Sequence, residues 1–453
     1  MIIKPMVRNN ICINTHPIGC ERETGRQIDF VAARQPLYAK LRGPKAVLVV
    51  GASTGYGLAS RVAAAFGFGA ATVGVAFEKE PTATKGGTPG WYNTRAFEAA
   101  AKVRGIPFAS VNGDAFSKAV KDQVVEAARA LGVKFDLIVY SLASPVRTDP
   151  ETGVLHRSVI KPIGSAYRGR TVDLFTKAFS EAEIVGASEA EITDTVKVMG
   201  GEDWALWIEA LEKGGALARP REGRGAATVA YSYLGPSLSW PIYRDGTIGR
   251  AKAHLDATAL ELRSRYAAHK LEAYVSVNKA LVTRSSAVIP IIPLYVSTLF
   301  KVMKEKGNHE DCVAQIDRLY RERLYAQPAA APMAAAPIAA EASTMARGSG
   351  IVATDPEGRI RLDDLEMSPG VQAEVEARMA HIDTSNVGLL SDVDGFRDDF
   401  LRVHGFAVEG VDYSAEVAPN YDPASADASA APVGVAPGSG LPTGAIASTT
   451  SVP

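Results

Sequence analysis

Short apolar runs alternate with helix-forming segments through the first third of the chain. The apolar runs, which are typical of strands covered on both faces, are residues 46–50, 71–77, 107–111 and 135–140. The helices predicted between them are residues 56–66, 92–103 and 118–131. Strands that alternate with helices in this order pair in parallel, so the pattern predicts an α/β fold with a Rossmann-type, doubly wound parallel sheet.

A glycine-rich turn follows the first predicted strand. Residues 51–57, with the sequence GASTGYG, lead from that strand into the first predicted helix. Glycines in such a turn let the backbone approach a pyrophosphate, and the N–H groups of the helix N-terminus bind its charge. The spacing Gly-x-x-x-Gly-x-Gly is that of short-chain-dehydrogenase-type Rossmann folds and predicts a bound nucleotide. The alternative is a turn in which the glycines serve a purely steric purpose.

The ends of the later strands carry further candidate contacts, because ligands of open α/β sheets bind outside the carboxyl ends of the strands. Glu78 follows the second strand, where an acid accepts hydrogen bonds from the ribose of NADH and repels the 2′-phosphate of NADPH. Asp114 and Ala115 follow the third strand, and residues 141–145 follow the fourth. Ordinary turns are the alternative for each segment, since Asp, Ser, Gly and Pro dominate turns for local reasons.

Residues 230–252 contain the groups that a nicotinamide-dependent reductase uses to handle a proton. Tyr231, Tyr233 and Tyr243 are candidate hydrogen-bond donors to a substrate carbonyl, and Lys252 is the candidate cation beside the cofactor ribose. Spacing alone does not establish this function, because aromatic residues that pack a strand and a helix start give the same pattern.

Composition excludes several classes of protein. The chain has 453 residues with 49 Lys and Arg against 50 Asp and Glu, so nucleic acid is not an expected partner. Its three scattered cysteines suit neither a disulfide framework nor a zinc site, and we expect no metal. The N-terminus lacks the apolar core of a signal peptide, and the apolar stretch 287–300 is short and interrupted by prolines. We therefore expect a cytoplasmic enzyme with no membrane insertion.

Two regions rich in alanine and proline divide the chain. Residues 326–350 are a predicted linker or inserted loop, and residues 417–453 are a predicted disordered tail, because both contain few large apolar groups. Residues 1–325 then form the NADH-binding catalytic domain. Residues 351–416 are its C-terminal part and include an amphipathic helix predicted at 396–406.

Specific motifs occur in order along the chain. Tyr243 and Lys252 have eight residues between them and stand in the sequences WPIY and GRAK. Other motifs are MIIKP at residue 1, THPIGC at residue 15, GWYN at residue 90, NGDAF at residue 112, YSLASPVR at residue 140, VKVMGGEDW at residue 196 and GRIRLDD at residue 358. Together, over residues 1 to about 415, they resemble the FabV-type bacterial enoyl-acyl-carrier-protein reductases, also described as trans-2-enoyl-CoA reductases.

This resemblance implies an NADH-dependent monomer that reduces the trans-2 double bond of enoyl thioesters on acyl carrier protein or CoA, the last reductive step of fatty acid elongation. It implies that Tyr243 donates the proton, that Lys252 binds the cofactor ribose and that Tyr233 contacts the substrate. The implied NADH contacts are Gly51, Ala52, Ser53, Thr54, Gly55, Tyr56, Phe77, Glu78, Asp114, Ala115, Leu142, Ala143, Lys252, Leu281, Val282 and Thr283.

Two other functions fit part of the pattern. A carbonyl reductase of the short-chain-dehydrogenase type would use a Tyr and a Lys on the same fold, but with three residues between them instead of eight. A non-enzymatic NAD-binding sensor would keep the glycine-rich turn and Glu78, but would need neither Tyr243 nor Lys252.

Overall fold

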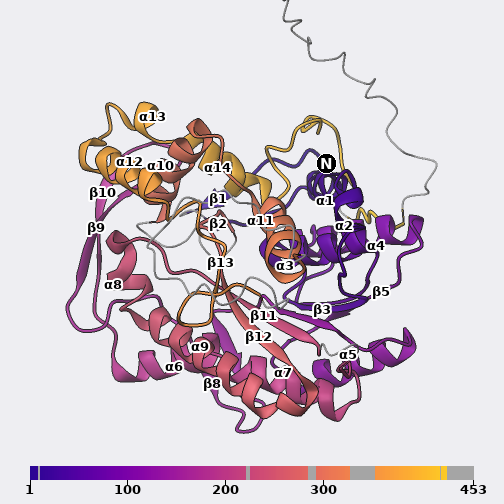
Figure 1. The fold of residues 1–453 in the computed structure, drawn as a ribbon. Coiled ribbons are helices and arrows are strands. Elements are labelled where there is room, and N and C mark those ends of the chain that lie inside the picture. Colours follow the sequence, from indigo (N-terminus) through magenta and orange to yellow (C-terminus); the bar gives the residue numbers. More distant parts are fainter. Residues whose placement is uncertain (9–10, 221–224, 284–291, 327–351, 419, 426–453) are drawn as a thin grey trace, which may run out of the picture.

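A seven-stranded parallel sheet forms the centre of the computed structural model, which describes residues 1–425 except 9–10, 221–224, 284–291, 327–351 and 419. Its spatial order is β13-β12-β11-β6-β3-β4-β5 (Figure 1). In chain order the strands are β3 (Ala46–Val50), β4 (Ala71–Ala76), β5 (Phe108–Asn112), β6 (Leu137–Tyr140), β11 (Ala227–Ser232), β12 (Glu272–Val277) and β13 (Ile360–Arg361). The predicted doubly wound sheet is confirmed.

The four predicted strands are present, with small shifts at their ends. The strand expected at 107–111 is β5, displaced by one residue, and the run 135–140 forms β6 only from Leu137. Phe135 instead makes an isolated parallel bridge with Leu217. Successive connections proceed outward from β3 to β5 and then return to β6 on the other side of β3, which places the switch point of the sheet between β3 and β6.

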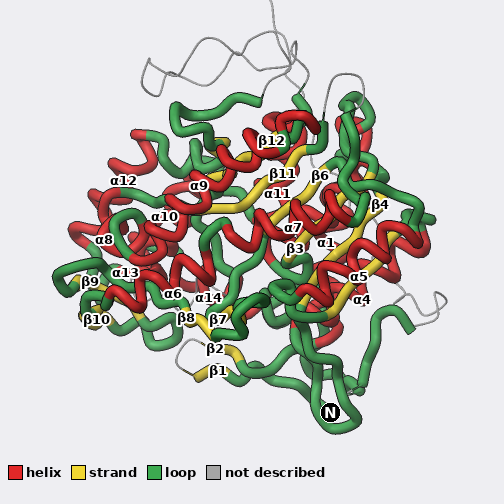
Figure 2. Tube along the Cα trace, turned by 90° about the horizontal axis from the view of Figure 1, so that it is seen from below, coloured by secondary structure: helices red, strands yellow, loops and turns green. Residues whose placement is uncertain are grey.

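Helices cover both faces of the sheet, because side chains of each strand point alternately to the two faces. In β3, Val47 and Val49 pack into the core under α1 and α3, whereas Leu48 and Val50 pack into the core on the opposite face. The first face carries α1 (Pro17–Ala32), α2 (Gln35–Tyr38), α3 (Gly55–Val62), α4 (Pro89–Val103) and α11 (Cys312–Arg318). The second carries α5 (Lys118–Ala130), α6 (Glu189–Met199), α7 (Glu202–Lys213) and α9 (Thr247–Arg265) (Figure 2).

A third group of helices packs beyond the ends of the central strands. Its members are α8 (Trp240–Tyr243), α10 (Ile292–Glu305), α12 (Pro369–His381), α13 (Val387–Leu390) and α14 (Val393–Arg402). The helix predicted at 396–406 is α14, which starts earlier because the Asp392 side chain accepts a hydrogen bond from Gly395 N. Its buried Phe396 packs against Phe300 of α10, with ring centroids 6.3 Å apart.

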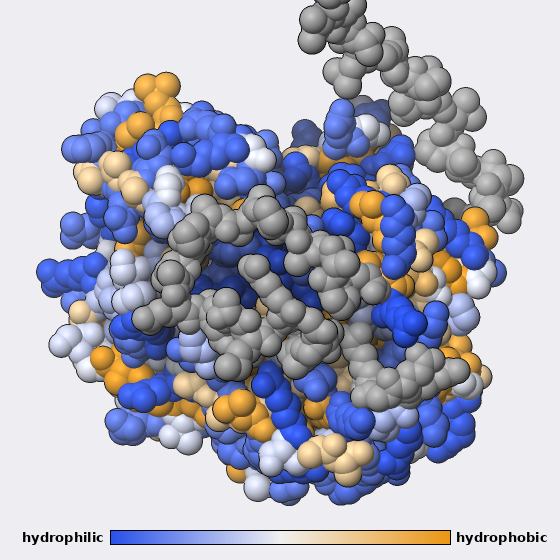
Figure 3. Space-filling model, viewed as in Figure 1, coloured by the Kyte–Doolittle hydropathy of each residue, from blue (hydrophilic) through white to orange (hydrophobic). Residues whose placement is uncertain are grey.

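Short antiparallel pairs complete the fold at its edges. They are β1 (Val7–Arg8) with β2 (Ile11–Cys12), β7 (Val146–Thr148) with β8 (Leu155–Arg157), and β9 (Tyr167–Val172) with β10 (Phe179–Ile184). On the face drawn in Figure 3, apolar side chains lie scattered among hydrophilic ones, and the surface is hollowed near its centre. None of the helices in the described part of the chain is long and apolar enough to cross a membrane.

The last described residues contact the N-terminal residue of the chain and helix α4. Val417 N donates to Met1 O at 3.0 Å, and Asp422 forms paired hydrogen bonds with Arg95 of α4. The folded part of the chain therefore continues past residue 416, into the region assigned to the tail from its composition. Most of the predicted insert at 326–350 and the tail from residue 426 lie outside the described residues.

A buried ion pair joins α5 to α7 beneath the sheet. Lys121 Nζ lies 2.7 Å from Asp203 Oδ1, and Tyr140 donates to Asp203 Oδ2 at 3.1 Å. Burial lowers the pKa of Lys121 and raises the pKa of Asp203, so each charge depends on its partner. Lys121 also donates to the carbonyls of Ala115 and Phe116, which fixes the loop after β5.

We expect Lys121→Met to lower the free energy of unfolding by about 3–5 kcal/mol, because it leaves the Asp203 carboxylate buried without its cation. Lys118→Met is the matched control: its ion pair with Asp122 is exposed, and such pairs contribute less than about 1 kcal/mol. Urea unfolding measures both variants. Adding Asp203→Asn to Lys121→Met should recover part of the loss, and equal destabilisation by the two lysine substitutions would contradict this role.

Candidate active site

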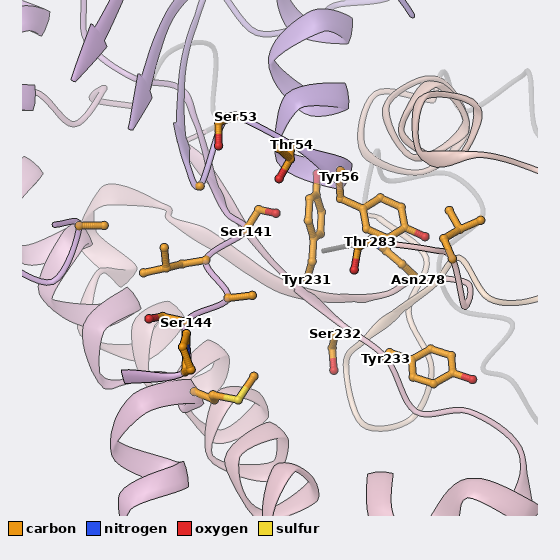
Figure 4. Close-up of a pocket in the computed structure, with 18 of the residues that line it drawn as sticks. Ser53, Thr54, Tyr56, Ser141, Ser144, Tyr231, Ser232, Tyr233, Asn278 and Thr283 are labelled. Carbon is orange, nitrogen blue, oxygen red and sulfur yellow. The ribbon is translucent and has the colours of Figure 1, made fainter. Parts of the chain in front are cut away.

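A cavity of about 640 Å³ lies at the carboxyl ends of the central strands. The loops that follow β3, β4, β5, β6, β11 and β12 contribute to its wall, together with residues of α8, α9 and α10. Figure 4 shows Ser53 and Thr54 near the start of α3, and Ser232 and Tyr233 on the opposite side of the cavity. Every candidate site residue inferred from the sequence lines this cavity except Ala52 and Val282.

The glycine-rich turn is compact because it passes close to the end of β6. Gly51 has a φ of +86°, and a Cβ there would lie 2.3 Å from Ser141 O. A Cβ at Gly57 would lie 1.8 Å from Gly51 O, so the first turn of α3 also requires glycine. The structure leaves Ser53, Thr54, Gly55 and Tyr56 on the cavity wall.

Two residues predicted as cofactor contacts, Ala52 and Val282, do not line this cavity. Ala52 is buried, and its N–H, like that of Gly51, donates to Val75 O at 2.9 Å. Its backbone group is therefore committed to β4. Val282 lines a separate cavity of about 100 Å³ beside α11 and α14, whereas its neighbours Leu281 and Thr283 line the main one. The assignment of Ala52 and Val282 as cofactor contacts stays a prediction, although neither residue lines the main cavity.

Glu78 is fixed at the tip of β4 by contacts on both its backbone and its side chain. Asn112 accepts from Glu78 N at 2.8 Å and donates to Glu78 O at 2.9 Å. Ser53 donates to Glu78 Oε1 at 2.7 Å, and Gly90 leaves room for the carboxylate, since a Cβ there would lie 2.2 Å from Oε1. The acid is thus held beside the glycine-rich turn, where hydroxyl groups of a ribose would reach it.

The remaining wall residues at this end follow three strands. Phe77, at the end of β4, has an exposed fraction of 78% and offers an apolar ring at the cavity mouth. Asp114 and Ala115 follow β5, where Asp114 Oδ1 accepts from Phe116 N at 3.0 Å. After β6, Leu142 and Ala143 line the middle of the cavity together with Ser141 and Ser144.

Tyr243 and Lys252 lie on different helices, which accounts for their eight-residue separation. Tyr243 ends α8, and Lys252 lies in the second turn of α9. Lys252 Nζ donates to Ser232 Oγ at 3.2 Å, and the Tyr243 ring stands perpendicular to that of Tyr233 with centroids 5.1 Å apart. All of these residues line the same cavity.

Burial controls the charge of these groups. It lowers the pKa of Lys252 to about 7, against a smaller opposing effect of the Asp256 carboxylate. It also raises the pKa of Tyr243, with a further contribution from the Glu366 carboxylate. Tyr243 is therefore a neutral phenol that can donate a hydrogen bond at neutral pH.

The third candidate donor, Tyr231, has a different environment. Its hydroxyl lies 2.6 Å from Ser60 Oγ, and Figure 4 shows its ring directed toward the start of α3. Its ring also packs edge-on against Tyr56, with centroids 5.8 Å apart. Tyr231 thus belongs to the packing under α3, as the structural alternative predicts, and Tyr233 and Tyr243 face the chemistry end of the cavity.

Sequence reasoning missed several residues because the strands β11 and β12 were not assigned. Ser232 ends β11 and Asn278 follows β12, where it donates its backbone N–H to Ser232 O at 2.9 Å. Asn278 Nδ2 is buried and has no hydrogen-bond partner in the described structure, so it offers a donor for a polar ligand. The largely apolar runs 227–232 and 272–277 would have predicted β11 and β12, and with them the positions of Ser232 and Asn278 at the strand ends.

The fold, the glycine-rich turn and the acid after the second strand define a Rossmann-type oxidoreductase that uses a nicotinamide nucleotide. Residues 2–83 match the family model of the NAD(P)H binding domain of trans-2-enoyl-CoA reductase, and residues 85–325 match the model of its catalytic region. The chain belongs to the trans-2-enoyl-CoA reductase family.

Individual relatives are similar over almost their whole length. The trans-2-enoyl-CoA reductase [NADH] of Treponema denticola is 52% identical over 92% of this chain and 98% of the relative. The enoyl-[acyl-carrier-protein] reductase [NADH] of Cytophaga hutchinsonii is 50% identical over 93% of this chain and 98% of the relative. A crystal structure of the Treponema denticola reductase in complex with NAD superposes with a TM-score of 0.85, at 52% identity, and covers 93% of this chain and 99% of that one.

Residues 354–417 match a third model, described as an enoyl reductase FAD binding domain. The described residues of this segment do not fit a flavin: none of them lines the 640 Å³ cavity. Three of them, Asp399, Arg402 and Val403, line the cavity of about 100 Å³, whereas pockets for ligands of drug size hold roughly 300–1,000 Å³. We assign no flavin chemistry to this segment.

We expect Glu78→Ala to raise the ratio of NADPH to NADH activity about tenfold or more, because it removes the charge that would repel a 2′-phosphate; a tenfold change is about 1.4 kcal/mol. Glu80→Ala is the control, since Glu80 is exposed and does not line the cavity. Initial rates with each cofactor test this. An unchanged ratio in Glu78→Ala would show that Glu78 does not select the cofactor.

Proposed function

We propose that this protein uses NADH to reduce the trans-2 double bond of enoyl thioesters carried on acyl carrier protein or CoA, the last reductive step of fatty acid elongation. The observation that carries the proposal is the placement of Tyr243 and Lys252 at one end of a cavity whose other end is bounded by the glycine-rich turn and Glu78. The names of the relatives support both thioesters, since one is an enoyl-CoA reductase and the other an enoyl-carrier-protein reductase.

Bound NADH would supply the hydride that reaches C3 of the enoyl thioester. Negative charge then develops on the thioester oxygen, and the Tyr243 hydroxyl is the donor that meets it. Because Tyr243 is buried and neutral, its hydrogen bond strengthens as the oxygen becomes anionic and stabilises the transition state more than the ground state. Protonation at C2 completes the saturated acyl chain.

Lys252 assists from the second turn of α9. In its protonated form it places a positive charge in the same low-dielectric wall as Tyr243, and its contact with Ser232 fixes the direction of the ammonium group. A cofactor ribose is the group that such a donor would orient. Asn278 and Thr283 add neutral polar groups to the same wall.

An apolar surface next to Tyr243 suits the acyl chain. It is formed by Ile160, Met199, Ile248, Ile292 and Val296, all of which line the cavity. Ile292 and Val296 belong to the apolar stretch 287–300, of which residues 287–291 lie outside the described residues. An apolar acyl chain fits this environment.

We expect Tyr243→Phe to keep NADH binding and to lower turnover with crotonyl-CoA about a hundred- to thousandfold, because losing one oxyanion donor costs about 3–4 kcal/mol. Tyr266→Phe is the control for the loss of a hydroxyl, because Tyr266 caps the C-terminal end of α9 and does not line the cavity. NADH oxidation gives turnover, and NADH fluorescence titration gives binding. Near-normal turnover in Tyr243→Phe would remove the residue from the mechanism.

Parallel assays of the unchanged protein separate the candidate functions. We expect NADH oxidation with crotonyl-CoA and with a crotonyl carrier-protein thioester, and none with a simple ketone. Activity with the ketone alone would indicate a carbonyl reductase. NADH binding without oxidation of any of these substrates would indicate an NAD-binding sensor.

The pKa of Lys252 gives a pH dependence. Because it lies at about 7, Lys252 carries its charge below that pH and loses it as the pH rises. We expect kcat/KM for NADH, which reports the free enzyme, to fall as the pH rises through about 7. In Lys252→Arg the charge persists, so this inflection should disappear whatever the remaining rate. A wild-type profile that is flat between about pH 6 and 8 would contradict a role for the charged lysine.

A further inference from the structure

A buried carboxylate from the C-terminal part of the chain lies directly behind the cavity wall. Glu366 follows β13 and precedes α12, and its exposed fraction is 0%. It does not line the cavity itself. A carboxylate in this position must be compensated by hydrogen bonds or by a nearby cation, because burial penalises its charge.

Three donors from separate elements converge on this carboxylate. Oε1 accepts from the hydroxyls of Tyr295 at 2.7 Å and Tyr233 at 3.1 Å, and Oε2 accepts from Ala280 N at 2.6 Å. Gln372 of α12 holds the same residue from behind, donating to Glu366 O at 2.7 Å. Both carboxylate oxygens are therefore engaged, and the side chain has one orientation that satisfies all three donors.

A nearby lysine supplies the compensating charge. The Lys279 Coulombic attraction lowers the pKa of Glu366 against the effect of burial, and burial in turn lowers the pKa of Lys279 to about 8. Lys279 Nζ donates to Ala280 O at 3.1 Å and lies 4.6 Å from the centroid of the Phe300 ring. The charge of the Glu366 carboxylate is thus compensated by Lys279 and by the three hydrogen bonds from Tyr295, Tyr233 and Ala280.

Two of the donors that Glu366 holds, Tyr233 and Ala280, line the chemistry end of the cavity. Tyr233 is the wall residue against which the Tyr243 ring packs perpendicularly. Ala280 begins the loop that brings Leu281 and Thr283 to the cavity. Rotation of the Tyr233 phenol away from Glu366 would remove the surface that fixes the angle of the Tyr243 ring.

We propose that Glu366 is a positioning residue for the reaction: through Tyr233 it orients Tyr243, and through Ala280 it fixes the loop that carries Leu281 and Thr283. This inference rests on the proposed function, because it assigns Glu366 a role in the same site. It also gives residues 354–417 a role in the activity that requires no flavin. That role is to supply the carboxylate that accepts hydrogen bonds from the wall residues Tyr233 and Ala280.

The decisive variant is Glu366→Gln, which keeps the shape of the side chain but replaces one acceptor oxygen by an NH2 donor. The amide cannot accept from the tyrosine pair and from Ala280 N together. We expect kcat/KM for crotonyl-CoA to fall at least about tenfold, within the range of coupling between contacting residues, while the melting temperature changes by only a few degrees. Glu374→Gln is the matched control, because its carboxylate pairs with Arg378 on the outside of α12 and its side chain is partly exposed.

A double-mutant cycle distinguishes positioning from general support of the fold. In the Tyr233→Phe background the hydroxyl that Glu366 orients is already absent, so Glu366→Gln should reduce kcat/KM much less than it does in the unchanged enzyme. Effects that simply multiply would overturn the proposal, as would unchanged kinetics of Glu366→Gln. If Glu366→Gln does not fold, Tyr295→Phe serves instead: it removes one of the donors to Oε1 without touching the cavity and should lower kcat severalfold. Unchanged kcat in Tyr295→Phe would then overturn the proposal.

Failure of this inference is distinct from failure of the proposed function. If the unchanged protein does not oxidise NADH with either thioester, the proposed function is wrong. If it does so and Glu366→Gln matches it in kcat and KM, only the role of Glu366 is wrong.

Discussion

The close approach of two strand ends at the switch point of the sheet is the constraint on which the site depends. Ser141 N donates to Val50 O. A Cβ at the next residue, Gly51, would lie 2.3 Å from Ser141 O, so no side chain fits there. The chain after β3 must therefore turn sharply into α3, while the chain after β6 runs past it. The crevice between them opens at the carboxyl ends of β3 and β6, where an open α/β sheet binds its ligand.

The two ends of this crevice differ in their chemistry. Backbone groups, small hydroxyl side chains and one acid, Glu78, form the end beside α3. At the other end, burial lowers the pKa of Lys252 and Lys279 and raises that of Tyr243 and Glu366. Buried titratable groups interact strongly because little water screens them. The first end is suited to hold a nucleotide without reacting, and the second to respond to a charge that forms during a reaction.

The sequence allowed the central strands and the nucleotide end of the site to be predicted, because both depend on local patterns. A buried parallel strand needs a run of apolar residues, and the turn after β3 needs glycine at positions that the chain itself shows. Glu78 could be placed because an acid at a strand end points to a ribose. The orientation of individual residues could not be predicted in the same way. Ala52 faces β4 through a hydrogen bond to Val75, and nothing in the order of residues indicates which N–H of the turn is used there.

Contacts between distant parts of the chain could not be predicted from local sequence patterns. Ser232 was overlooked as the partner of Lys252, and Glu366 as the acceptor for Tyr233, because these partners are 20 and 133 residues apart. Tyr231 and Tyr233 are separated by one residue, which would place both side chains on the same face of a continuous strand. However, β11 ends at Ser232, and the hydroxyls of the two tyrosines reach different partners, Ser60 for Tyr231 and Glu366 for Tyr233. The end of β11 had to be assigned before Tyr231 could be given to the packing under α3 and Tyr233 to the contact with Glu366.

The separation of Tyr243 from Lys252 has a physical consequence for the whole C-terminal region. With three residues between them, a tyrosine and a lysine would lie on one face of a single helix, and the helix backbone would fix their relative position. Here a turn separates α8 from α9, and glycine is required within it: a Cβ at Gly246 would lie 2.3 Å from Ile242 O. Tyr243 therefore ends one helix while Lys252 belongs to another, and the helix backbone alone does not set the angle of the tyrosine ring. Packing against Tyr233 supplies that angle, and the carboxylate of Glu366 holds Tyr233. A reductase built on two helices in this way needs a further segment behind the wall of its cavity, and residues 354–417 occupy that position.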